Sequence, residues 1–383
     1  MNKAKNILEK AKNALKKAAS YLSPRVPIWC RVFIGITVFS LIIHIISVNS
    51  PAFADFISGT FGVATRFILA KLTMWLPFSF AELILISMPV WLFVLIYFAI
   101  KAATSKKQYV YAKYVCFLLC IVMVIYSSFV LTLGTAYHGK TLDQKMGINT
   151  ELVSPKELYD TASILLEGAQ KELDNVHFRY GSSSVMPYDL NTMNKYLNEA
   201  AKKAADKYPF ITKLSSNLKY VMLSEPMSYT HITGVYTFFT GESNININFP
   251  DYTIPFTAAH ELSHQRGIAR ENEANFCAFL ICMESDDPYI RYSAYVNMYE
   301  YFTSPLFSAD SELYYDLAAK VDNRIKQEMR AFNEFFDKYE KNVAASVSGT
   351  INNSYLQSQG QTAGSKSYGL VVDLAVAYLL REE

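Results

Sequence analysis

Three residues near the middle of the chain have the types and spacing of a metal-dependent hydrolase. His260, Glu261 and His264 occur within the stretch PFTAAHELSHQRG. Residues four apart lie on one face of a helix, so His260 and His264 can bind one Zn²⁺ through two imidazoles. In this H-E-x-x-H arrangement zinc lowers the pKa of a bound water to about 7, and the glutamate takes the proton of that water. The motif predicts one zinc per chain and hydrolysis of peptide bonds with Glu261 as general base.

Two helices must hold this site. Pro255 suits a first helical position and Gly267 suits the residue just past a helix end, which predicts a helix over 256–266. A second helix is predicted over 270–284, and its first turn carries Glu271 and Glu273. A glutamate there can supply the third zinc ligand.

Glu271 and Glu273 lie about 200° apart on a helix, so only one can face the metal. The face of Glu271 continues with small residues, which allow the two helices to approach closely, namely Ala274, Asn275, Ala278 and Cys282. The face of Glu273 continues with larger core residues. We therefore predict Glu271 as the third ligand and keep Glu273 as the alternative. Asn275, one turn further, can bond the free nitrogen of a ligand histidine.

The pattern Glu271-x-x-Ala274 followed by Asn275 resembles the third-ligand pattern of the glutamate zincins, the superfamily of thermolysin-like and membrane-embedded CAAX-type metallopeptidases. The chain departs from that pattern in a very short interval between His264 and Glu271 and in an Asn where Asp is usual. The stretch 228–280 and the C-terminal KSYG and VVDL also resemble a bacterial family, domain-of-unknown-function family 3810. Its members combine membrane spans near the N-terminus with this zinc motif, which implies a zinc peptidase and leaves the substrate open.

The N-terminal part of the chain predicts a multi-pass membrane protein. Uncharged apolar stretches long enough to cross a bilayer occur at about 32–48, 80–100 and 115–136. The stretch at about 56–76 is apolar but contains Arg66 and Lys71, so we interpret it as an interfacial or re-entrant helix and favour three spans over four. The basic head at 1–28 and the loop at 101–114 carry most of the Lys and Arg of this part, which places them in the cytoplasm. The domain at 137–383 is then extracytoplasmic, on a bacterial cell membrane.

The N-terminal head and the C-terminal domain have net charges of opposite sign. Residues 1–28 have seven Lys or Arg and one acid, whereas residues 137–383 have 22 basic and 31 acidic residues. This asymmetry argues against nucleic acid as the main partner and fits a protein whose head lies beside anionic lipid. The five cysteines lie in apolar segments and are interpreted as buried apolar residues rather than a disulfide framework.

The sequence predicts that the extracytoplasmic part is mainly α-helical with a small sheet, which is an α+β zincin-like domain. Strand-like residues occur at 233–239 and 245–249, and the residues between them, with Glu242, have the composition of an exposed hairpin turn. The first strand can cover the core or can pair with an extended substrate. Further helices are predicted over 155–175, 189–207, 288–302, 311–343 and 368–380.

Peptide hydrolysis develops an oxyanion, and a Tyr or His donor is expected to stabilise it together with the metal. The polar, glycine-containing loop 358–366 leads to Tyr368 at the start of an apolar helix, so Tyr368 is the predicted donor and His231 the alternative. The predicted partners are a peptide or protein substrate at the outer membrane face and the lipid bilayer. The other two interpretations are an envelope scaffold or binding protein with a structural zinc site, and a zinc amidase that acts on cell-wall peptide.

Overall fold

The computed structural model describes residues 26–107, 109–179, 183–340, 342–364 and 370–381. The chain divides into two compact units, Met1–Ile45 with Leu83–Val130 and Ile46–Glu82 with Leu131–Glu383. We refer to them as the smaller and the larger unit. The segment 46–82, predicted from the sequence to be part of the membrane region, packs with the larger unit, which also contains the H-E-x-x-H motif.

The smaller unit is built from three long apolar helices, α2 (Ile28–Asn49), α5 (Phe80–Thr104) and α6 (Val110–Thr132), whose ends extend into the larger unit. Most of their apolar side chains are exposed, as expected for residues that face lipid. Cys30, Cys116 and Cys120 form a small buried cluster between α2 and α6. The ring of His44 is hydrogen-bonded to the Tyr126 hydroxyl at 3.1 Å.

Four helices among the described residues are long and apolar enough to cross a membrane, judged by length and composition. Three are α2, α5 and α6. The fourth is the continuous helix Pro51–Thr73, which consists of α3 (Pro51–Ile57), the π-helical segment η1 (Ser58–Gly62) and α4 (Val63–Thr73). The chain therefore has the helices of a membrane protein, as the sequence predicts.

The helix Pro51–Thr73 contacts other parts of the larger unit near its start, in its middle and at its end. Near its start, Asp55 forms an ion pair with Lys145 at 3.1 Å. In its middle, the buried Arg66 donates from Nη1 to the carbonyl oxygen of Thr132 at 2.6 Å. At its end, the Thr73 hydroxyl donates to the carbonyl oxygen of Thr240 at 3.4 Å.

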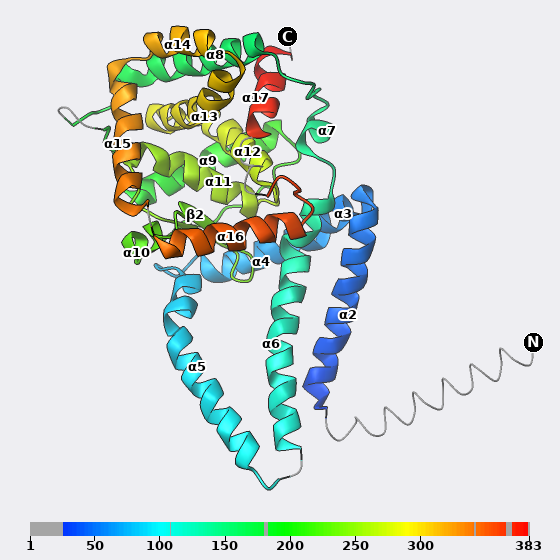
Figure 1. The fold of residues 1–383 in the computed structure, drawn as a ribbon. Coiled ribbons are helices and arrows are strands. Elements are labelled where there is room, and N and C mark those ends of the chain that lie inside the picture. Colours follow the sequence, from blue (N-terminus) through cyan, green and yellow to red (C-terminus); the bar gives the residue numbers. More distant parts are fainter. Residues whose placement is uncertain (1–25, 108, 180–182, 341, 365–369, 382–383) are drawn as a thin grey trace, which may run out of the picture. The chain divides into compact units, whose positions relative to one another are not determined.

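The rest of the larger unit is mostly helical (Figure 1). Its α-helices after the membrane segments are α7 (Leu142–Met146), α8 (Pro155–Glu172), α9 (Leu190–Lys207), α10 (Ser224–Ser228), α11 (Ile254–Gln265), α12 (Glu271–Met283), α13 (Pro288–Ala309), α14 (Ser311–Lys320), α15 (Asn323–Tyr339), α16 (Val343–Ser358) and α17 (Val371–Leu380). Short 3₁₀ turns are η2 (Gly134–His138), η3 (Leu173–Asn175) and η4 (Asp251–Thr253).

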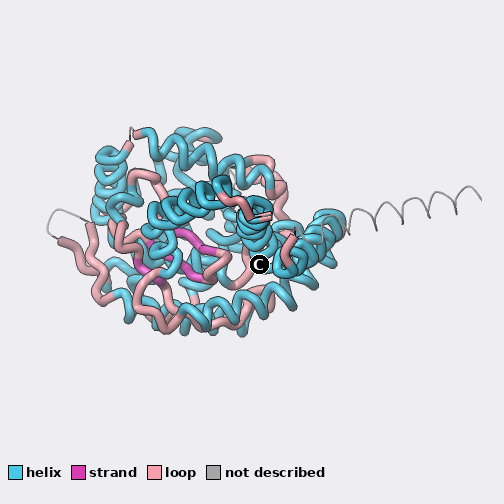
Figure 2. The backbone as a smooth tube through the Cα atoms, turned by 90° about the horizontal axis from the view of Figure 1, so that it is seen from below, coloured by secondary structure: helices cyan, strands magenta, loops and turns pink. Residues whose placement is uncertain are grey.

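A three-stranded sheet lies among these helices (Figure 2). Its order is β1 (Lys219–Tyr220), β3 (Glu242–Ile245), β2 (Gly234–Thr237), with β1 parallel and β2 antiparallel to β3. The predicted second strand at 245–249 is wrong, because β3 begins at Glu242 and ends at Ile245. The turn is the shorter segment 238–241, in which Gly241 has a φ of +71° and approaches α4 so closely that a Cβ would lie 2.6 Å from the Cβ of Leu69.

Two helix predictions also need correction. The long helix predicted over 311–343 is two helices, α14 and α15, because Val321 has extended backbone and the side chain of Asp322 accepts a hydrogen bond from the Arg324 N–H, which starts a new helix. The helix α16 was not predicted; it starts at the N-cap Asn342, whose side chain accepts from the Ala345 N–H. The last helix, predicted from residue 368, is described from Val371 onward.

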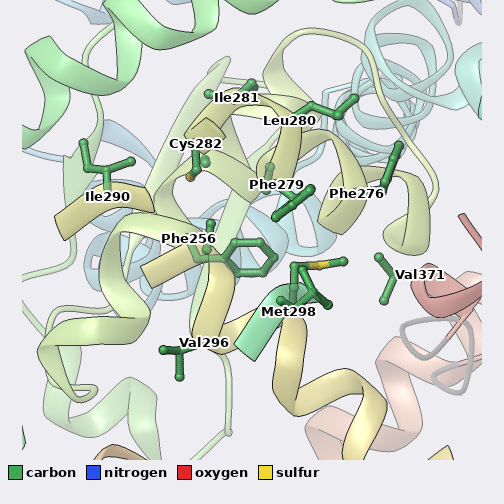
Figure 3. Close-up of a cluster of buried hydrophobic side chains, with 14 of the residues drawn as sticks. Phe256, Phe276, Phe279, Leu280, Ile281, Cys282, Ile290, Val296, Met298 and Val371 are labelled. Carbon is green, nitrogen blue, oxygen red and sulfur yellow. The ribbon is translucent and has the colours of Figure 1, made fainter. Parts of the chain in front are cut away.

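The core that positions the site is formed by α11, α12 and α13. Phe256 of α11, Phe279 of α12 and Met298 of α13 are buried together (Figure 3). Because α11 and α12 are both packed in this core, their first and last turns are held in fixed positions relative to each other.

Candidate metal centre

The site begins with the way α11 ends. Gly267 has a φ of +98°, the left-handed conformation that favours glycine. Its N–H donates to the carbonyl oxygen of His264 at 2.9 Å, and the N–H of Ile268 donates to that of Ser263 at 3.1 Å. This pair of bonds is the Schellman motif. It reverses the chain so tightly that α12 starts at Glu271 and its first turn lies against α11.

Three potential ligand atoms converge between the two helices. Nε2 of His260 and Nε2 of His264 lie 3.0 Å apart. Oε2 of Glu271 lies 3.2 Å from the first and 3.3 Å from the second. The side chains are between 8% and 12% exposed, so the cluster is almost completely removed from water.

Hydrogen bonds determine which ring nitrogens carry protons. Nδ1 of His264 lies 2.7 Å from the carbonyl oxygen of Ile268, which can only accept, so Nδ1 donates. Nδ1 of His260 lies 2.7 Å from Oδ1 of Asn275 and donates in the same way. Nε2 is therefore the nitrogen that each ring leaves available to a metal, and the two Nε2 atoms face each other and the Glu271 carboxylate. Three electron-pair donors at van der Waals distance or closer repel one another unless a proton or a cation lies between them.

The short distances between these side chains shift the pKa values of His264 and Glu271. Burial alone would lower the pKa of His264, but the carboxylate of Glu271 outweighs it and raises the pKa to about 9. Burial alone would raise the pKa of Glu271, but His264 and His260 outweigh it and hold that pKa well below its usual range. The three residues thus form a pocket that favours positive charge between them.

Glu261 lies next to this cluster, between α11 and the edge strand β2. Burial raises the pKa of Glu261 to about 7, against the opposing effect of His260 and His264. Its Oε2 is buried without a hydrogen-bond partner, and the backbone of Tyr236 opposes the rise of the pKa. A Cβ on Gly234 would lie 2.6 Å from Oε1, so Gly234 provides the space that the carboxylate occupies.

The comparison with known families can now be stated. A family model with the description "Protein of unknown function (DUF3810)" matches residues 58–376. The chain belongs to the DUF3810 family. The match begins in η1 and ends in α17, so in this DUF3810 protein it includes α11, α12 and the converging ligand atoms. No curated protein and no solved structure matches the chain.

The alternative ligand Glu273 is engaged elsewhere in the DUF3810 protein. Its Oε1 accepts hydrogen bonds from the Leu142 N–H and from Nη1 of Arg270, both at 2.9 Å. It therefore holds the first turn of α7 to α12, and Glu271 is the glutamate that the structure brings to the two histidines.

Several other predicted residues have different surroundings from those expected. Glu242 is not an exposed turn residue, because it is 1% exposed and accepts from the N–H groups of Phe80 and Ala81 at the start of α5. His231 donates from Nε2 to the carbonyl oxygen of Tyr339 at 2.9 Å. Tyr368, the predicted oxyanion donor, lies outside the described residues of the DUF3810 protein.

Sequence reasoning missed two tyrosines beside the cluster. Burial and the Glu300 and Glu271 carboxylates raise the pKa of Tyr301, on α13, against the opposing effect of the Asn275 side chain. Burial raises the pKa of Tyr355, on α16, to about 12, and the Glu271 carboxylate adds to this shift. The Tyr355 hydroxyl donates to that of Tyr137 at 3.1 Å. These residues come from distant segments, so no local spacing could have indicated them.

Proposed function

We propose that this DUF3810 protein is a membrane-anchored zinc-dependent metallopeptidase. The observation that carries the proposal is the convergence of two imidazole Nε2 atoms and one carboxylate oxygen within 3.0–3.3 Å of one another. A buried carboxylate oxygen without a partner, Oε2 of Glu261, lies beside them. Structural zinc sites use four protein ligands, whereas a three-ligand set leaves a position for water, as in catalytic sites.

The donor set fits zinc. Neighbouring ligand atoms of a tetrahedral zinc lie about 3.3 Å apart, given bonds of about 2.0–2.1 Å, and the three separations here are close to that value. Two imidazoles with one carboxylate is the ligand set of thermolysin-type zinc hydrolases. The bonds from the histidine Nδ1 atoms to Asn275 and to the Ile268 carbonyl are the outer-shell bonds that orient such ligands.

Each residue then has a role in hydrolysis. Zinc held by His260, His264 and Glu271 would polarise a water and the scissile carbonyl. Glu261 takes the proton of the attacking water on its free Oε2 and gives it to the leaving nitrogen. The edge strand β2, which lies against Glu261, offers its backbone to an extended peptide. The oxyanion donor is Tyr355, which lies near Glu271, or Tyr368.

We infer three membrane spans and an extracytoplasmic active site. A helix that is bonded to a polar domain at both ends, by Asp55 to Lys145 and by Thr73 to Thr240, cannot also be surrounded by lipid, so Pro51–Thr73 is best explained as an interfacial helix. With α2, α5 and α6 as the spans, the basic head and the larger unit lie on opposite sides of the membrane. The Lys and Arg distribution then places the larger unit outside.

The substitution Glu261→Gln tests the proposal against the scaffold alternative. Gln has the same shape and cannot take a proton, so the variant should keep its zinc while hydrolysis of a mixture of peptides falls by about 10³-fold or more. A protein with a purely structural zinc would show no zinc-dependent hydrolysis in either form. Cleavage of cell-wall peptide but of no ordinary peptide would instead identify an amidase.

A further inference from the structure

Three segments of the larger unit share an unusual surface composition. The segment 226–241, which leads into and through β2, has no Asp, Glu, Lys or Arg. Residues 343–364, which include α16, have none either. In α4 the two charged residues are Arg66, which is buried, and Lys71, whose Nζ lies 5.7 Å above the ring of Phe67. The remainder of the extracytoplasmic sequence is rich in charge, so we call these three segments the uncharged surface.

Large apolar side chains project from this surface. On α16, Val343, Val347 and Ile351 are 80%, 52% and 64% exposed, and their spacing of four places them on one stripe. Other exposed members lie on α4, after α10, on β2 and in the β2–β3 turn, namely Phe67, Ile68, Leu72, Tyr229, Val235 and Phe239; Phe61, Trp75, Met222 and Leu223 are exposed apolar residues that flank these segments in the sequence. A monomeric soluble domain rarely exposes so many neighbouring apolar groups without a partner for them.

Specific contacts join the three segments. The β2–β3 turn lies against α4, since a Cβ on Gly241 would stand 2.6 Å from the Cβ of Leu69. His231 donates to the carbonyl oxygen of Tyr339, the last residue of α15 and four residues before α16, and the rings of Tyr229 and Tyr339 meet edge to face at 4.9 Å. Figure 1 shows α4, α10 and α16 along one edge of the larger unit and α14 at the opposite edge.

The covalent connections of α4 identify what covers this surface. One residue separates the candidate span α2 from the helix Pro51–Thr73, and six residues separate Thr73 from the start of α5. A residue of extended chain spans at most about 3.6 Å, so both ends of this helix must stay close to the bilayer in which α2 and α5 lie. Exposed Trp75 after α4 and Lys71 beside Phe67 are residue types typical of the membrane interface.

We propose that the uncharged surface rests on the lipid bilayer and that the site therefore acts on peptide segments presented at the bilayer surface. The second part rests on the proposed peptidase function. The edge strand β2 belongs to the uncharged surface and also carries Gly234 beside Glu261. Tyr355 belongs to α16 and lies near Glu271. A substrate strand that reaches β2 thus approaches along the lipid, as a juxtamembrane or lipid-attached segment would.

Membrane depth can be measured on the full-length protein in phospholipid nanodiscs. All five native cysteines are buried, so spin labels can be attached to Val347→Cys and Phe239→Cys, with the unsubstituted protein as background. Tyr315→Cys is the matched control, because Tyr315 is an aromatic residue 64% exposed on α14. Labels at 347 and 239 should be more accessible to oxygen than to a polar nickel complex, and the label at 315 should show the reverse. Equal, water-like accessibility at all three positions would overturn the lipid contact.

Substrate presentation is tested in proteoliposomes with one mixture of quenched peptides, either free in solution or attached to phospholipid. Wild type should cleave the attached peptides at least tenfold faster than the free ones. In the double variant Val347→Glu/Ile351→Glu, the ratio of the cleavage rate of attached peptides to that of free peptides should fall at least tenfold, while free peptides are cleaved at the wild-type rate. Tyr315→Glu should behave as wild type. An unchanged ratio in the double variant refutes the presentation role. If wild type cleaves neither form, the peptidase function fails, and the depth measurement still decides whether the surface contacts lipid.

Discussion

Gly234 lies directly against Glu261, since a Cβ at position 234 would stand 2.6 Å from Oε1 and 2.7 Å from Cγ of that glutamate. The glutamate is on α11, is buried, and lies against β2. The edge strand thus fixes the position of the proposed general base.

Replacing Gly234 by Ala should therefore displace Glu261 and leave the metal ligands in place. We expect zinc content to be unchanged and hydrolysis to fall by about 10²-fold or more, the usual contribution of a general base. Gly349→Ala is the control, because a Cβ there meets no atom within 4 Å. Normal turnover of Gly234→Ala would show that the carboxylate position does not matter.

The oxyanion donor can be identified with two conservative substitutions. Tyr355→Phe removes only a hydroxyl that lies near Glu271, so it should keep zinc and fold while kcat falls by about 10²–10³-fold. Tyr368→Phe should have the smaller effect. If the large loss follows Tyr368→Phe instead, the donor is the residue predicted from the sequence and Tyr355 packs α16 against Tyr137.

Glu328 should make stability depend on pH. It is fully buried on α15, accepts from the Ser184 N–H and the Tyr292 hydroxyl, and burial, with a contribution from Asp251, raises its pKa to about 7. An acid whose pKa is higher in the folded than in the unfolded state stabilises the fold at low pH, and this stability is lost as the pH rises from about 4.5 through 7. The loss amounts to at most about 3 kcal/mol.

Glu328→Gln removes this titration. Relative to wild type, the variant should gain thermal stability between pH 5 and pH 8, as measured by intrinsic fluorescence in detergent. Asp251 is retained in both proteins, so its own titration cancels to first order. A wild-type-to-variant difference that does not change with pH would mean that Glu328 is ionised throughout.

The topology can be tested by cysteine labelling with a reagent that does not cross membranes. Gly139 is a poor reporter because a Cβ there would collide with the Asp55 carboxylate. Leu152 is fully exposed and lies in the part of the chain that we propose to be extracytoplasmic. Leu152→Cys should be labelled in intact cells and Lys106→Cys only after lysis. The opposite pattern would place the active site in the cytoplasm.

What could be predicted from the sequence was local. The ends of α11 follow from Pro255 and Gly267, and the position of Glu271 on α12 follows from helical spacing. The break between α14 and α15 was also local, and Asp322 as an N-cap could have indicated it.

Long-range contacts could not be predicted. Glu242 has the composition of a turn, and only the distant N–H groups of Phe80 and Ala81 explain its burial. The strand β1 is two residues long and is defined by its pairing with β3. The helix α16 has no charged residues and contains Ser, Asn and Gly, which are weak helix formers, so its sequence resembles a polar loop.

The zinc content of the purified protein tests the central claim most directly. Metal analysis after purification without added chelator should find one zinc per chain in wild type and in Glu273→Gln, whose glutamate bonds Leu142 and Arg270 instead. His264→Ala and Glu271→Gln should lose high-affinity zinc, because two remaining ligands hold the ion poorly. Full zinc in both of these variants, or none in wild type, would contradict the account.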